Sequence, residues 1–435
     1  PYTTLFRSSQ ILSFTLLDLL RQVSAHYVRS STSNRTRAGL AVCYGKIARS
    51  LPTKLIESNY ITIADHLMGD VLSHPNIINN RYRLLITRKF VQVVLENIIG
   101  QEILGESGQI DATKRLINDV LKNYPQVIKE RSEPTKYALI AALSAITSFI
   151  KALGSAAAAF GDACRDGLLQ VIQHPSYTVQ LYTSQCLRTF ALACPQQLLP
   201  CLTICMNSLN REMNLLTSNT GRQSPRRCVG YANALSALIS TSPLQPLYSS
   251  VDVDSRVLSL ATGLLKSSGK SELRVSGTQI QVAWILIGGL MSLGPNFVKI
   301  HLSQLLLLWK NALPKPLAKD NTAQRSYLES SFLTHVRECA LSSILAFLQF
   351  NGKLLTTDVS KRIAAMLQNT SAFLKGLPMK KTTEDVPQRL FPSLQLHDLD
   401  LMTQRRVLQC YTKLVNLSIL QEVGSVITTN SVQFY

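Results

Sequence analysis

The fold class is decided by residues 171–209, which read VIQHPSYTVQLYTSQCLRTFALACPQQLLPCLTICMNSL. One helix is expected to end near His174-Pro175, a second to cover residues 178–194, and a third to start directly after Pro195. Apolar residues recur along both later helices at the spacing of one helical face. Such a helical pair cannot bury its apolar face alone, so the pattern predicts neighbours of the same kind.

The same order of apolar helix, break and apolar helix recurs further along the chain. Residues 282–294, VAWILIGGLMSLG, break at Pro295, and a leucine-rich helix is expected at 298–312. Residues 335–348, HVRECALSSILAFL, form another apolar helix. The recurrence distance is roughly 40 residues or a small multiple, which is typical of HEAT and armadillo arrays. We therefore predict an all-α fold, an α-solenoid of HEAT/armadillo-like helical hairpin repeats in a right-handed superhelix.

The composition agrees with a packed helical array. The chain of 435 residues is too long for one ordinary core, and a solenoid avoids that limit because each repeat packs only on the next. With 46% apolar and only 16% charged residues, the chain is not intrinsically disordered. The apolar stretch 137–160 is long enough to span a bilayer, but it contains Lys151 and several Ser and Thr, so a buried solenoid helix is predicted.

The chain is predicted to form one domain. Residues 1–8, PYTTLFRS, resemble translated read-through from a sequencing adaptor and are excluded from the fold. Residues 9–435 are predicted as one continuous HEAT-repeat array, with longer loops near 217–227 and 375–395. Residues 100–108 hold three glycines and are also predicted as a loop. No polar capping segment closes the C-terminus, so a piece of a longer protein is expected.

The motifs of the common enzyme classes are missing. The Gly288-Gly289 pair lies in an apolar helix and is not followed by the Lys-Ser/Thr of a phosphate-binding loop. Neither H-E-x-x-H nor G-x-S-x-G occurs, and acidic residues are sparse. We predict that the chain is not an enzyme and has no cofactor.

The nine cysteines lack a metal-binding or disulfide pattern. Cys201 and Cys205 share a helix face but stand among leucines, and His335 and Cys339 lie in a helix interior that supplies no activating environment. No C-x-x-C pair is present and the number is odd, which favours a reducing cytosol. We predict no metal site, at least six buried cysteines and no disulfide bond.

Basic residues outnumber acidic ones and give a formal net charge of +19, which favours acidic partners. The sharpest surface feature is TGRQSPRRC, residues 220–228. There Arg222, Ser224, Arg226 and Arg227 form a candidate anion-binding or phosphorylation-regulated loop. A flexible solvated loop is the alternative.

The two tryptophans are predicted to be core residues. Trp284 and Trp309 occupy apolar positions of the consecutive helices around Gly294-Pro295. Antiparallel helices joined by a short turn bring their apolar faces together, so each indole is expected to be buried within one repeat.

Two segments carry a resemblance to a known family. The sequences QIQVAWILIGGLMSLGP, residues 279–295, and HLSQLLLLWK, residues 301–310, strongly resemble the HEAT-repeat-containing protein 5 family. Residues 174–199 match the preceding repeat of that family, and the similarity covers nearly everything after Ser8. It implies the N-terminal portion of a longer family member and carries over no catalytic residue.

This resemblance implies a role in membrane traffic. Members are large cytosolic solenoids that associate with the clathrin adaptor complex of the trans-Golgi network and endosomes through aftiphilin and gamma-synergin. The expected function is a non-enzymatic scaffold in adaptor-dependent vesicle trafficking. It would be cytoplasmic and attached peripherally, through its partners, to the trans-Golgi network, endosomes and clathrin-coated vesicles.

Two other functions remain open from the residues alone. A nucleic-acid-binding HEAT scaffold would use the positive charge, but no dense basic stripe with interleaved aromatics is present, so no nucleic acid is expected as a partner. A nuclear transport receptor-like solenoid would bind basic cargo signals, which a chain of charge +19 would repel.

Overall fold

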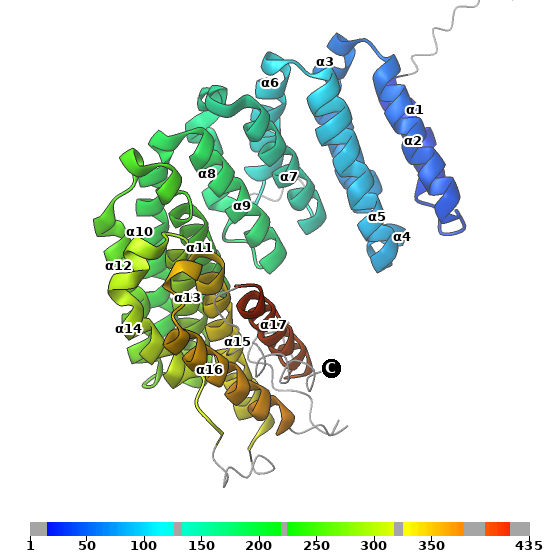
Figure 1. Ribbon diagram of the computed structural model, residues 1–435. Coiled ribbons are helices and arrows are strands. Elements are labelled where there is room, and N and C mark those ends of the chain that lie inside the picture. The colour runs from blue at the N-terminus through cyan, green and yellow to red at the C-terminus, as the bar shows by residue number, and fades with distance from the viewer. Residues whose placement is uncertain (1–14, 126–132, 219–223, 317–324, 378–395, 418–435) are drawn as a thin grey trace, which may run out of the picture. The chain divides into compact units, whose positions relative to one another are not determined.

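The computed structural model describes residues 15–125, 133–218, 224–316, 325–377 and 396–417. Every regular element within these ranges is a helix (Figure 1). The prediction of an all-α, helical-repeat fold is confirmed. The chain divides into two compact units: unit 1 holds residues 1–172 and 178–194, and unit 2 holds residues 173–177 and 195–435. A single continuous array stays a prediction.

Unit 1 is a stack of antiparallel helices, several of which finish in wider π-helical turns. Helix α5 passes into η2 without a break, and α3 passes into η1 in the same way. The elements are α1 (Leu16–Tyr27), α2 (Asn34–Ser50), α3 (Thr53–Asp65), η1 (His66–Leu72), α4 (Pro75–Ile78), α5 (Arg81–Gln92), η2 (Val93–Ile103), α6 (Glu106–Leu116), η3 (Ile117–Leu121), α7 (Lys136–Leu153), η4 (Gly154–Phe160), α8 (Gly161–Val171) and α9 (Tyr177–Ala193).

The apolar helix α7 forms the centre of unit 1. Thr135 caps its N-terminus by accepting a hydrogen bond from the Ala138 amide at 3.2 Å. Leu139, Leu143 and Ile146 follow at three- and four-residue spacing and are fully buried. The region 136–171 is apolar and long enough to cross a membrane, and 56% of its most apolar window is buried within the described structure. Such burial is what a core helix of stacked repeats requires.

The glycine-rich stretch 100–108 is helical except at Leu104 and Gly105, contrary to the predicted loop. Helix η2 continues to Ile103, and Gly100 is buried beneath the Phe149 ring. A Cβ atom on Gly100 would lie only 2.4 Å from Phe149 Cε1. The glycine therefore makes room for an aromatic ring of α7, and the sequence pattern did not distinguish this use from a turn.

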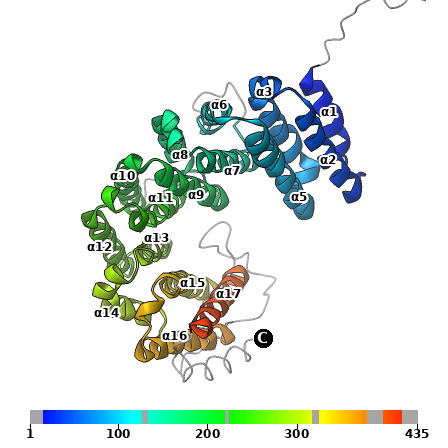
Figure 2. The same cartoon turned by 45° about the horizontal axis from the view of Figure 1, so that its top comes forward.

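Unit 2 consists of two rows of helices (Figure 2). Helices α10, α12 and α14 form one row, while α11, α13, α15 and α17 pack side by side in the other. The elements are η5 (Pro195–Gln197), α10 (Leu198–Thr217), α11 (Ser224–Ile239), η6 (Ser242–Leu244), η7 (Pro246–Tyr248), α12 (Val251–Ser268), α13 (Leu273–Met291), α14 (Pro295–Ala312), α15 (Tyr327–Phe350), η9 (Gly352–Leu354), α16 (Thr357–Lys375) and α17 (Leu396–Asn416).

Buried polar contacts tie neighbouring helices of the second row. The Asn351 amide donates to the Met291 carbonyl at 2.9 Å and joins the ends of α15 and α13. The Arg406 guanidinium of α17 donates to Glu338 of α15 at 3.1 Å. Each contact pairs a polar group that burial would otherwise leave unsatisfied, so it fixes which residues face each other between repeats.

Both tryptophans are buried, as predicted, but the partners of Trp309 differ from the expected ones. Its indole N–H donates to Ser343 Oγ at 2.8 Å, and its ring lies 5.4 Å from the Phe347 ring. Both contacts belong to α15, the helix after α14, rather than to α13 across the Gly294-Pro295 turn. Trp309 therefore joins α14 to the next helix of the stack.

Eight of the nine cysteines are buried and Cys43 is exposed, which confirms the predicted burial of at least six. Burial raises the pKa of Cys186, Cys228 and Cys410 to about 12, so these groups stay as unreactive thiols at neutral pH. We expect a thiol reagent to label about one cysteine rapidly under native conditions and the others only on unfolding. Time-resolved labelling with mass spectrometry measures this. Fast labelling that persists in Cys43→Ser would contradict the described helix faces.

Candidate functional site

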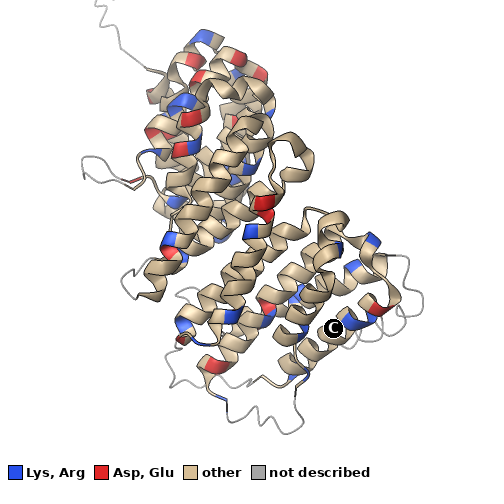
Figure 3. Ribbon diagram, turned by 90° about the vertical axis from the view of Figure 1, so that its left-hand side faces the viewer, with Lys and Arg blue, Asp and Glu red and all other residues tan. Residues whose placement is uncertain are grey.

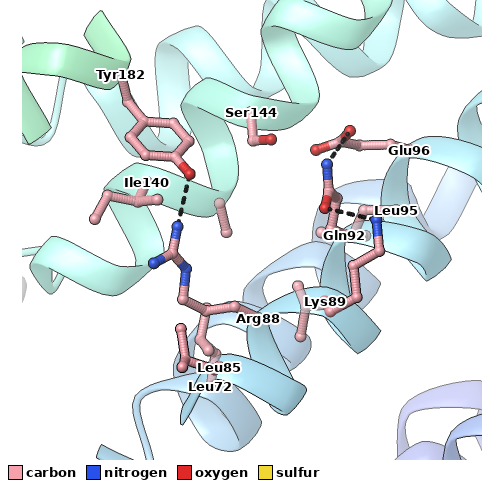
Figure 4. A pocket seen from close by; sticks show the side chains of 12 residues that line it. Leu72, Leu85, Arg88, Lys89, Gln92, Leu95, Glu96, Ile140, Ser144 and Tyr182 are labelled. Carbon is pink, nitrogen blue, oxygen red and sulfur yellow. Dashed lines mark hydrogen bonds between the residues drawn. The ribbon is translucent and has the colours of Figure 1, made fainter. Parts of the chain in front are cut away.

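A groove in unit 1 lies between α5, η2, α7 and α9 (Figure 4). Its volume is about 250 Å³. The floor is apolar and is made by Leu72, Val91, Leu95 and Ile140, which are all buried. On the rim Leu85 leaves about half of its surface exposed. An apolar floor of this kind favours the burial of a hydrocarbon or aromatic group.

One end of the groove is closed by an arginine and a tyrosine. The Arg88 guanidinium donates to the Tyr182 hydroxyl at 2.7 Å, and its carbon lies 5.6 Å from the centre of the tyrosine ring. Figure 4 shows this bond bridging α5 and α9. The contact fixes the guanidinium at the rim, where its charge faces the groove.

The other end carries a chain of polar groups on α5 and η2. Lys89 donates to the Gln92 side-chain oxygen at 3.3 Å, and the Gln92 amide donates to Glu96 Oε2 at 3.1 Å. Glu96 is only 8% exposed, and its other oxygen, Oε1, has no hydrogen-bond partner. Figure 4 shows this carboxylate turned toward Ser144 of α7 across the groove. Among the described residues Oε1 therefore stays unsatisfied, but it has almost no solvent-accessible surface, so it does not face the open space of the groove.

The residues of the groove come from segments far apart in the sequence. Arg88, Lys89 and Glu96 belong to one segment, Ser144 to another and Tyr182 to a third. Each of the three segments, taken alone, has the pattern of an ordinary amphipathic helix. The sequence pattern therefore did not reveal this site. The available signal was the pair Arg88-Lys89 about two turns before Glu96, on the side of the apolar run that follows.

The predicted anion-binding residues lie at the start of α11. Arg222 is outside the described residues, and Arg226 is exposed. Ser224 is buried in the first turn, and its hydroxyl donates to Glu212 Oε2 of α10 at 3.1 Å. Arg227 Nη1 lies 3.7 Å from Glu212 Oε1. The helix therefore includes Ser224 to Arg227, and Glu212 holds it against α10; regulation by phosphate at this position stays a prediction.

The pair of His335 and Cys339 is placed where it cannot act as a nucleophile. Cys339 Sγ lies 3.7 Å from His335 Nε2, and both side chains are buried between helices. Burial lowers the pKa of His335 to about 4 and raises the pKa of Cys339 well above its usual value. Both groups are neutral at physiological pH, which leaves the thiol inactive.

A second exposed feature is the apolar connection between α11 and α12. Leu247 is 93% exposed, and Leu244 and Val251 also project from the surface around two short 3₁₀ turns. Two prolines, Pro243 and Pro246, fix these turns. Exposed apolar side chains in one short segment are typical of a contact surface.

In the part of the chain that the structure describes, charged residues do not gather into one stripe. Figure 3 shows Lys and Arg spread over many helices and interspersed with Asp and Glu. Several of them form surface ion pairs, such as Arg49 with Glu102 at 2.7 Å. Among the described residues no cluster of three or more His, Cys, Asp or Glu is arranged to hold a metal ion.

A search of curated proteins finds a similarity to the "AP-1 accessory protein LAA1" of Saccharomyces cerevisiae. The two sequences are 23% identical over 425 residues. This chain is a distant relative of an AP-1 accessory protein. The alignment covers 91% of this chain and 19% of LAA1, so the chain spans about a fifth of the length of that relative. No protein-family model matches the chain, and no solved structure matches it.

Proposed function

We propose that this chain is a non-enzymatic scaffold that binds the clathrin adaptor AP-1, directly or through accessory proteins. The observation that carries this proposal is the similarity to an AP-1 accessory protein across 91% of the chain. An alignment of that extent covers nearly all of the helices of this chain, so the similarity is not confined to a single repeat.

The architecture supports binding rather than catalysis. Stacked helices present long faces to partner segments, and the groove of unit 1 and the apolar connection of unit 2 are two places where a partner gains buried area. The titratable pair His335 and Cys339 is held neutral, so it offers no activated nucleophile.

The finer parts of the proposal rest on the resemblance to the HEAT-repeat-containing protein 5 family. In that form, aftiphilin- and gamma-synergin-like proteins link the chain to AP-1. The scaffold then acts in the cytoplasm at the trans-Golgi network, endosomes and clathrin-coated vesicles, and is attached to membranes through these partners.

Affinity capture tests the proposal. We expect the immobilised chain to retain AP-1 subunits from cytosol at physiological salt, as detected by immunoblotting. An unrelated helical-repeat protein of similar positive charge serves as control, because a net charge of +19 retains acidic proteins non-specifically. Recovery of no AP-1 subunit even at low salt, or equal recovery by the control, would count against the proposal.

A further inference from the structure

We propose that the end of unit 1 where α2 and α5 begin binds an acidic, phosphoserine-containing segment of a partner protein. The site is built from the loop between α1 and α2, residues 28–33, and from the first turns of α2 and α5. The proposal goes beyond the adaptor role because it concerns the chemistry of the bound segment and holds for whichever protein carries it.

Positive charge is concentrated in this part of the chain. Residues 19–56 and 71–95, which supply most of α1 and all of α2, α4 and α5, contain eleven Lys or Arg and no Asp or Glu. Among the cations at the shared end of α2 and α5, Arg29, Arg35 and Arg81 are exposed and form no ion pair with the described residues. Their charge is therefore open to a partner.

Hydrogen bonds hold the loop and the start of α5 together at this end (Figure 1). Arg37 donates to three carbonyls of residues 27–32, and Arg83 of α5 donates to the Ser30 carbonyl at 3.0 Å. The two guanidinium groups are close, since the pKa of Arg37 is lowered by burial and then by the charge of Arg83. The loop carbonyls are thus used within the chain, whereas the amides of Ser30, Ser31 and Ser33 donate to no other described residue.

Both helices place arginine where a helix favours an anion. The N-terminus of a helix carries partial positive charge, which an acidic residue of the first turn offsets, as Asp18 does in α1. The first turns of α2 and α5 contain no acidic residue and include Arg35 and Arg81 instead. Cations at these positions cost stability, and a bound anion recovers it.

The donors at this end favour phosphate groups over carboxylates. A phosphate monoester carries nearly two negative charges and three acceptor oxygens, whereas a carboxylate carries one charge and two oxygens. Guanidinium groups bind phosphate oxygens in pairs, and the exposed cations of the loop and of the two first turns are all Arg rather than Lys. Because these arginines come from a loop and two helices, they suit an extended segment rather than one isolated phosphate.

The loop also favours a protein segment over a lipid surface or a nucleic acid. Residues 29–35, RSSTSNR, contain no apolar side chain. Segments that enter a lipid surface carry apolar side chains, and sites for single-stranded nucleic acid carry aromatic side chains on which bases stack. A phosphorylated segment needs only the charges and hydrogen-bond donors that the loop offers.

Binding of labelled peptides to the full chain, measured by fluorescence anisotropy at physiological salt, tests this assignment. The probes are an acidic peptide with three phosphoserines, its unphosphorylated form and a neutral form with amides in place of its carboxylates. We expect the phosphorylated peptide to bind roughly fivefold or more tightly than the unphosphorylated one. Equal affinities of these two would overturn the choice of phosphate. Equal binding by the neutral peptide would overturn the site for acidic segments altogether.

Variants of the chain test the location. Joint replacement of Arg29, Arg35 and Arg81 by Ser is expected to weaken the phosphorylated peptide roughly tenfold or more. The matched control lowers the net charge equally by replacing three exposed cations of unit 2 with Ser: Arg274, Lys299 and Lys310. Its effect should stay below about twofold, because screening by salt limits long-range attraction. Equal losses in both variants would overturn the site.

A lysine variant tests the guanidinium geometry. Replacement of the same three arginines by Lys keeps the charge but removes paired hydrogen bonding, so part of the affinity should be lost. Unchanged affinity would overturn the role of arginine. Circular dichroism checks the folding of each variant, and the comparison of peptides on the unaltered chain stands without them.

Two further probes separate the occupants. Vesicles of phosphatidylcholine and phosphatidylserine, or a labelled single-stranded RNA, would overturn the protein segment if either bound through the three arginines more tightly than the phosphorylated peptide. Tyr82→Ala removes an exposed aromatic ring beside Arg81 and should leave peptide binding unchanged. A tenfold loss with this variant would overturn recognition by charge and hydrogen bonds alone.

The proposal and the adaptor role fail separately. A chain that binds the phosphorylated peptide but captures no AP-1 would overturn the proposed function alone. A chain that captures AP-1 but does not distinguish the peptides would overturn the phosphoserine site alone.

Discussion

Replacement of Trp309 by alanine is expected to lower stability by about 3–5 kcal/mol, which is the usual cost of removing a large buried aromatic side chain. The indole is 0% exposed, packs on Phe347 and donates to Ser343. Its loss leaves a cavity between α14 and α15 and removes the hydrogen bond to the Ser343 hydroxyl, which keeps its own bond to the Ala340 carbonyl. In a stack of repeats the damage is largest in the host helices and their neighbours.

Hydrogen exchange measured by mass spectrometry resolves this prediction along the chain. Protection should fall in α14 and α15 of Trp309→Ala before it falls in more distant helices. Leu307→Ala is the matched control, since Leu307 lies two residues away on the same helix and is mostly exposed; its effect should stay within about 0.5 kcal/mol. A Trp309→Ala chain that kept its protection but lost a partner would make Trp309 a binding residue instead.

Replacement of Gly289 by alanine is expected to destabilise unit 2 by about 1–3 kcal/mol or more. A Cβ atom at this position would lie 2.7 Å from Ser236 Cα and 2.8 Å from Ser236 Cβ. The first of these is a backbone atom of α11, so relief requires α11 and α13 to move apart. The added methyl group therefore outweighs the better helix propensity of alanine.

The neighbouring glycine supplies the control. A Cβ atom on Gly288 would approach only Ser343 Cα, at 3.9 Å, which is ordinary contact. Gly288→Ala should therefore be neutral or stabilise the chain by up to about 1 kcal/mol through helix propensity. Urea denaturation followed by circular dichroism compares the two variants. Equal effects at both positions would show that α11 and α13 do not pack as closely as described.

The sequence determined the fold class and the main helix ends. The expected breaks are all present: His174-Pro175 lies between α8 and α9, while Pro195 and Pro295 are the first residues of η5 and α14, because proline is tolerated at the start of a helix but cannot continue one from the preceding turn. The burial of both tryptophans also followed from helical periodicity, which states which face is apolar. These properties depend on residues that are close together in the sequence, so one sequence is enough to predict them.

Contacts between repeats could not be predicted in the same way. Gly100 was read as a loop residue because the ring that covers it, Phe149, lies far away in the sequence. Trp309 was assigned to the wrong neighbour because the apolar pattern does not state which adjacent helix receives a side chain. The groove of unit 1 was missed for the same reason, since Arg88 and Tyr182 meet only in the folded stack.

Equilibrium binding of the purified chain to purified AP-1, measured by isothermal titration calorimetry, tests the central claim most directly. Saturable binding that persists at physiological salt is predicted, either with AP-1 alone or after addition of aftiphilin- or gamma-synergin-like accessory proteins. Absence of saturable binding in both mixtures, or heat that disappears with moderate salt as for non-specific charge attraction, would contradict the assignment of an adaptor scaffold.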